Sequence, residues 1–118
     1  MAYNGYEDLR VWQKSKALAV QVFVVLKNSK EYKLKEQMTK AALSIPSNIA
    51  EGYERKSSKE FIKFLGYSKG SASELKTQIQ IAKETGIIKE KTANEIINEL
   101  NTINSMIAGL IKSNKKTQ

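Results

Sequence analysis

The side chains best suited to chemistry in this sequence are cations near the middle of the chain. Four fall within nine residues: Arg55, Lys56, Lys59 and Lys63. A second row follows at seven-residue spacing: Lys69, Lys76 and Lys83. Cations at this density can hold phosphates, and Tyr53 and Tyr67 beside them can stack on bases. These seven cations form the predicted nucleic-acid-binding set. The alternative interpretation is a solvated lysine-rich face, with Glu54, Glu60 and Glu74 as local partners.

A row of polar residues lies just before these cations: Ser44, Ser47, Asn48, Glu51 and Arg55. At helical spacing they share one strip, which could accept a phosphate, base edges or a partner's backbone. The structural interpretation is favoured instead. In it, the two serines bond carbonyls disturbed by Pro46, and Glu51 pairs with Arg55 four residues later. Catalysis here would need a base that activates a serine, and only Glu51 or a lysine is available.

The composition argues against an enzyme. The 118 residues include no Cys and no His, which removes thiolate ligands, disulfides, the commonest general base and every triad of the Ser-His type. The glycines form neither a dinucleotide-binding fingerprint nor a P-loop. We therefore predict no catalytic residue, no cofactor and no metal ion.

The charge balance favours a polyanionic partner. Lys and Arg number 20 against 12 Asp and Glu, and both halves of the chain carry part of the excess of +8. Such a field attracts nucleic acid, although a net charge of this size also serves solubility alone. The first ten residues are acidic rather than apolar, and the longest apolar run, residues 17–26, is too short to span a membrane. We expect a cytoplasmic protein without a membrane partner.

Helical periodicity runs through most of the chain. Four helices are predicted, at about residues 7–27, 33–55, 58–85 and 89–113, within one domain spanning residues 1–118 with an ordered core of about 7–113. Their short connections predict an all-α, antiparallel, up-down-up-down four-helix bundle. Ser57 or Ser58 is expected to cap the third helix, and Gly86 to end it.

The second helix contains the only proline, Pro46. Its apolar residues stay in one helical phase on both sides of this position, so we predict a continuous helix that is kinked at Pro46. The alternative is a break, with Ser44 or Ser47 capping a new helix.

Two features of the pattern predict self-association. Residues 17–26 are apolar almost all round, with a stripe at seven-residue spacing: Val11, Leu18 and Val25. A helix that is apolar on every side is buried against more than its own bundle. A β-strand over residues 17–26 is the alternative. On the third helix, Gly66, Gly70 and Ser73 form a smooth strip that suits close contact with another copy, unless these glycines are simply tolerated on a solvated face.

The string Ser-Ile-Pro-Ser-Asn-Ile-Ala-Glu-Gly at residues 44–52 resembles a known family, as do Phe61, Leu65 and Gly70 with their neighbours. The chain is similar to bacterial four-helix bundle proteins encoded in intervening sequences of 23S ribosomal RNA genes. The family is related to the accessory variability protein of diversity-generating retroelements. Six positions of the string carry its motif: Ser44, Pro46, Ser47, Asn48, Glu51 and Gly52.

The resemblance implies a homopentameric ring whose basic surface meets RNA or DNA, and in the retroelement relatives also a reverse transcriptase. Two hypotheses follow. In the leading one, this is a non-enzymatic, homo-oligomeric bundle that binds structured RNA or DNA through Lys and Arg. In the alternative, it is a scaffold for another protein, and its charge only speeds docking.

Overall fold

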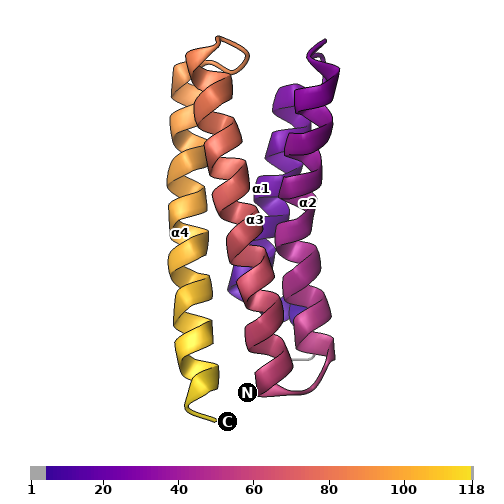
Figure 1. Cartoon of the computed structure of the whole chain (residues 1–118), viewed down its shortest axis with the longest axis vertical. Helices are drawn as coiled ribbons and strands as arrows, with labels where there is room; N and C mark the ends of the chain where they lie inside the picture. The colour runs from indigo at the N-terminus through magenta and orange to yellow at the C-terminus, as the bar shows by residue number, and fades with distance from the viewer. Residues whose placement is uncertain (1–4, 118) are drawn as a thin grey trace.

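The computed structural model describes residues 5–117 and contains four long helices within that range (Figure 1). A short 3₁₀ turn, η1, covers Tyr6–Asp8. The α-helices are α1 (Arg10–Leu26), α2 (Tyr32–Glu54), α3 (Ser58–Glu84) and α4 (Glu90–Lys115). The all-α, four-helix prediction is confirmed. Residues 17–26 lie within α1, so the β-strand alternative is wrong. The predicted domain also includes residues 1–4 and 118, which lie outside the described residues.

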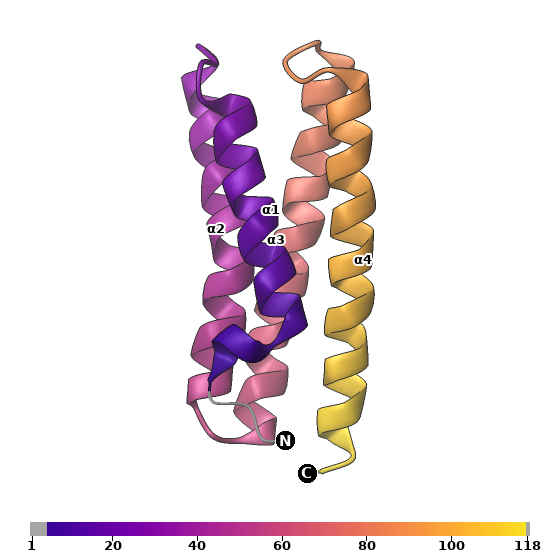
Figure 2. The ribbon, with the colours of Figure 1, turned by 180° about the vertical axis from the view of Figure 1, so that it is seen from behind.

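Successive helices run side by side in opposite directions (Figures 1 and 2). Each helix packs against its neighbour in sequence, and α1 also meets α4, where Lys14 and Glu99 form an ion pair of 3.9 Å. This order places α1 diagonally opposite α3. The α2–α3 turn and the C-terminal end of α4 lie at one end of the elongated bundle, which measures 45 × 23 × 20 Å. The α1–α2 and α3–α4 turns lie at the other.

The ends of α3 follow from local sequence. The Ser57 hydroxyl accepts a hydrogen bond of 3.3 Å from the Glu60 amide, so the predicted cap is confirmed at the first of the two serines. After α3, Gly86 adopts a φ of 78°, a conformation that suits glycine. This turn lets the amides of Ile87 and Ile88 donate to the Ala82 carbonyl and close the end of the helix.

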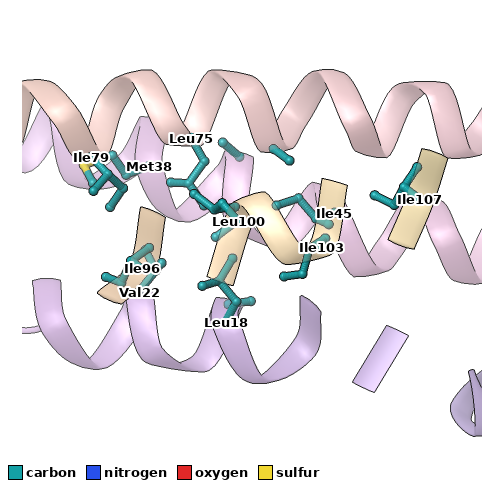
Figure 3. Close-up of a cluster of buried hydrophobic side chains, with 14 of the residues drawn as sticks. Leu18, Val22, Met38, Ile45, Leu75, Ile79, Ile96, Leu100, Ile103 and Ile107 are labelled. Carbon is teal, nitrogen blue, oxygen red and sulfur yellow. The ribbon is translucent and has the colours of Figure 1, made fainter. Parts of the chain in front are cut away.

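The core is a column of aliphatic side chains between the helices (Figure 3). Every helix contributes, and the labelled residues are all buried: Leu18, Val22, Met38, Ile45, Leu75, Ile79, Ile96, Leu100, Ile103 and Ile107. Each side chain buried in this way stabilises the fold by about 1.5–3 kcal/mol relative to exposure. The bundle therefore has a full hydrophobic core within one copy of the chain.

The structure reassigns the apolar stripe of α1. Val11 and Leu18 are each only 2% exposed and Val25 packs against the core, so the stripe predicted to meet another copy faces the core instead. The reason is that α1 packs against both α2 and α4, which buries a wider arc than one seam. The outward apolar side chains are Val20 and Val24, which are 55% and 65% exposed, together with Phe23.

Helices α2 and α3 make close contacts in the half of α2 that contains Pro46. Helix α2 continues through this buried proline, so the alternative of a break is wrong, and the predicted kink stays a prediction. The buried Ser68 hydroxyl of α3 donates a hydrogen bond of 2.8 Å to the Ile45 carbonyl of α2 and so joins the two helices. This bond sets the register in which Gly52 lies against Phe61 and Phe64.

Replacing Ser68 by alanine should lower the free energy of unfolding by about 1 kcal/mol, because the variant loses this buried hydrogen bond. Urea denaturation measures the difference. The matched control is Ser73→Ala on the exposed face of the same helix, for which we expect a change within about 0.5 kcal/mol. Equal effects of the two changes would contradict a stabilising role for the Ser68 bond.

Candidate functional site

Two basic segments that are far apart in sequence meet at one end of the bundle. The Ser58 hydroxyl of α3 and the Thr117 hydroxyl lie 2.8 Å apart in a hydrogen bond. Asn114 of α4 also shares the lining of a cavity of about 320 Å³ with Tyr53, Lys56 and Phe61 of the α2–α3 junction. These contacts place the last lysines of α4 next to the predicted cluster.

The positive charge at this end of the bundle depends on the contact between the α2–α3 junction and the end of α4. Residues 51–63 carry four cations against three carboxylates, so the segment alone is nearly balanced. The end of α4 adds three cations and no carboxylate. We call the combined surface the basic end, and it comprises Arg55, Lys56, Lys59, Lys63, Lys112, Lys115 and Lys116. The sequence interpretation included none of the last three lysines: it left Lys112 out of the binding set and placed Lys115 and Lys116 beyond the ordered core.

The α2–α3 turn holds its cations in defined places. Lys56 adopts a φ of 57°, which is uncommon for a residue with a side chain. Its amide donates to the Tyr53 carbonyl, and its Nζ atom lies 5.2 Å from the centre of the Tyr53 ring. That ring also packs edge-on against Phe61. Lys59, the second residue of α3, is exposed and lines the same surface pocket as Thr117.

The other two cations of the junction both lie over the buried ring of Phe64. The Arg55 guanidinium lies 4.9 Å from its centre and the Lys63 Nζ atom 5.8 Å from it. Arg55 also contacts a Glu51 carboxylate oxygen at 3.3 Å, with both side chains about half exposed. Contacts of this kind stabilise by only about 0.5–1 kcal/mol each, so a phosphate can displace the carboxylate.

The second predicted row does not join the basic end. The Nζ atoms of Lys76 and Lys83 each donate a hydrogen bond of 2.9 Å to α4, to Asn101 and Asn94 respectively. Both lysines are half-buried and tie α3 to α4. Lys69 is exposed farther along α3. The seven predicted cations therefore separate into a clustered four and a dispersed three.

The polar row on α2 makes bonds within its own helix. The Ser44 hydroxyl donates to the Lys40 carbonyl at 3.0 Å, and the Asn48 amide donates to the Ser44 carbonyl at 2.8 Å. With the Arg55 and Glu51 pair, these contacts favour the structural interpretation of the row. The Ala42 carbonyl has no helical donor, because Pro46 lacks an N–H group. The Ser44 hydroxyl does not bond this carbonyl but that of Lys40. Ser47 is exposed.

The family model described as 23S rRNA-intervening sequence protein matches residues 7–109. The chain belongs to this family. A solved structure of a protein of unknown function from the S23 ribosomal protein family of Bacteroides thetaiotaomicron VPI-5482 is similar to it, with a TM-score of 0.81 and 25% identity. The similarity covers 86% of this chain and 98% of that one. None of the functionally curated proteins matches the chain.

The family match covers the motif at residues 44–52 and the α2–α3 half of the basic end of this intervening-sequence protein. It stops before the α4 lysines, which are therefore features of this chain rather than of the matched segment. Among residues 5–117, no helix combines the length and apolar character needed to cross a bilayer. Nor does this part of the chain gather three acidic side chains in a metal-binding arrangement.

Proposed function

We propose that this intervening-sequence protein is a non-enzymatic, homo-oligomeric bundle that binds structured RNA or DNA through the basic end. The observation that supports the proposal is the convergence of the α2–α3 turn with the end of α4. It turns a nearly balanced segment into a surface of seven cations against three carboxylates. Lysines on exposed turns can follow a phosphate backbone, and binding releases the counterions condensed on it.

The test is fluorescence anisotropy of a structured ribosomal RNA fragment at low and physiological salt. We expect the Lys56→Glu, Lys59→Glu, Lys63→Glu variant to lose at least about tenfold in affinity. The slope of log affinity against log salt should become shallower by about three, one for each lost phosphate contact.

The matched control is Lys30→Glu, Lys33→Glu, Lys91→Glu, which makes the same charge change at the opposite end of the bundle. It should retain most of the affinity if the basic end is the binding surface. Equal losses in both variants would show attraction by net charge alone. Binding that vanishes at modest salt in the unaltered protein would contradict the proposal.

Self-association is the second part of the proposal. The exposed apolar residues of α1 are Val20, Phe23 and Val24. They lie on the opposite side of the bundle from the exposed Gly66 and Gly70 of α3, because α1 and α3 are diagonal. A contact between one face and the other on the next copy is heterologous, and such contacts form a ring where the rotation between copies closes and a filament where it does not. A ring agrees with the pentamer that the family resemblance implies.

A scaffold for a different protein, such as a reverse transcriptase, is the second candidate function. The observation that favours it is the same apolar face of α1, which nucleic acid would not cover. This candidate predicts a monomer in light scattering together with weak RNA binding that both charge variants reduce equally.

A further inference from the structure

The two tyrosines near the basic end differ in what covers their rings. The Tyr53 ring is half-buried, with Lys56 over its face and Phe61 edge-on beside it. Tyr67 on α3 is 50% exposed, and within the described residues its ring pairs only with that of Phe64. The two rings that look equivalent in sequence are therefore distinct, and Tyr67 has the accessible surface.

The contact with Phe64 positions the Tyr67 ring and leaves part of the ring surface uncovered. The two rings lie 5.3 Å apart and nearly perpendicular, at 81°. In a T-shaped pair, the Tyr67 ring offers either its edge or one of its faces, so at least one face stays uncovered by Phe64. Phe64 is itself buried, which fixes the position of the pair on the bundle.

The sequence around Tyr67 also leaves space beside the ring. Side chains in a helix lean toward the preceding turn, so the residues three and four positions later are those that would cover Tyr67. Here they are Gly70, which has no side chain, and Ser71, whose side chain is small. A Cβ atom added at Gly70 would meet no atom of the described chain within 4 Å, so the space beside the ring is open within one copy. A contact between copies that covers Gly70 would close this space, and the oligomeric state is therefore part of the test below.

Two cations lie near this open ring, through the Phe64 side chain that it contacts. Arg55 and Lys63 both lie over the Phe64 ring that contacts Tyr67, so one buried aromatic side chain positions two positive charges and an exposed tyrosine. An aromatic face flanked by cations is the arrangement that binds single-stranded nucleic acid, because the base stacks while the cations hold phosphates. Bases inside a duplex are already stacked on both faces and cannot use such a ring without being extruded.

We infer that Tyr67 is a stacking platform for an unpaired base, with Arg55 and Lys63 holding the neighbouring phosphates. The ligand of the basic end is then a loop, bulge or single-stranded segment rather than a continuous helix. This inference rests on the proposed nucleic-acid function and names the class of ligand for the same surface. It assigns a specificity role to a residue outside the cationic set.

The test uses two RNA probes of equal nucleotide number, a hairpin with an unpaired loop and a blunt duplex, each titrated at physiological salt. We expect Tyr67→Ala to weaken hairpin binding by about fivefold or more and to leave duplex binding unchanged, since stacking is lost only where a base is free. Tyr67→Phe should bind like the unaltered protein, because a phenyl ring also stacks. Tyr32→Ala is the matched control, since Tyr32 is an exposed tyrosine at the opposite end of the bundle.

A 2-aminopurine placed in the loop gives a direct readout, because its fluorescence falls when it stacks. We expect quenching by the unaltered protein and by Tyr67→Phe, but not by Tyr67→Ala. Equal binding of hairpin and duplex, or an unaffected Tyr67→Ala variant, would overturn the stacking inference and leave the proposed function standing. Failure of both probes to bind the unaltered protein would overturn both. A changed oligomeric state of Tyr67→Ala in light scattering would assign the ring to a contact with a second copy and also overturn the inference.

Discussion

Replacing Gly52 by valine is expected to lower the free energy of unfolding by about 3 kcal/mol, the upper part of the range for overpacking in a core. Gly52 is buried where α2 crosses α3, and a Cβ atom built there would lie 2.6 Å from the Phe64 Cβ and 3.2 Å from the Phe61 Cδ1. The first of these atoms belongs to the stem of a buried side chain and cannot rotate away. The helices must therefore separate, and the Ser68 to Ile45 hydrogen bond must lengthen with them.

Urea denaturation at a fixed protomer concentration measures this loss, because stability and assembly are coupled in an oligomer. The control is Gly109→Ala on the exposed face of α4, where an added Cβ meets no described atom within 4 Å. That change should raise the free energy of unfolding by about 0.5–1 kcal/mol through helix propensity alone. A Gly52→Val variant as stable as the unaltered protein would mean that α2 and α3 can move apart without cost. The family motif would then need another explanation for its glycine.

Gly52 illustrates what the sequence can and cannot predict here. The four helices could be placed within a few residues, because apolar periodicity, the Ser57 cap and Gly86 all indicate the same boundaries. The start of α1 is the main difference: η1 and the extended Leu9 separate the first turn from the helix, which therefore begins at Arg10 instead of about residue 7. Periodicity gives the phase of a helix but not the local backbone that precedes it.

The candidate site was predictable only in part, because its charge depends on tertiary register. The cluster from Arg55 to Lys63 is visible in the sequence, but its union with Lys112 and its neighbours requires the antiparallel packing that brings Thr117 to Ser58. The regular spacing of Lys76 and Lys83 suggested a binding row. Their asparagine partners on α4 could be found only by pairing the two helices. Likewise, spacing could not distinguish Tyr53 from Tyr67.

The same limit explains the error on α1. A stripe repeating every seven residues is compatible with either face of a helix that is apolar all round, and only packing against both α2 and α4 assigns Val11 and Leu18 to the core. That α1 offers an apolar surface to a partner stays a prediction, but other residues of α1 would form that surface. They are the valines on the outward side.

Introducing two charges on that surface is expected to convert the proposed assembly into monomers without unfolding them. In the Val20→Asp, Val24→Asp variant, both positions are more than half exposed, so the core of each copy is untouched. Within a contact between copies, however, each aspartate would be buried without a partner, and that desolvation opposes association. Light scattering should show the mass of one chain, while circular dichroism should show unchanged helix content.

Two further variants locate the contact. Leu18→Asp should unfold the chain itself, because Leu18 is buried in the core of a single copy. The second is Gly66→Leu with Gly70→Leu, which should separate the copies if the smooth strip of α3 receives the α1 face of the next one. Dissociation by the α1 change alone would mean that the surface in contact with the α1 face lies elsewhere on the bundle. An oligomer that survives the paired aspartates would contradict the proposed contact, because the α1 face would then lie outside the contact between copies.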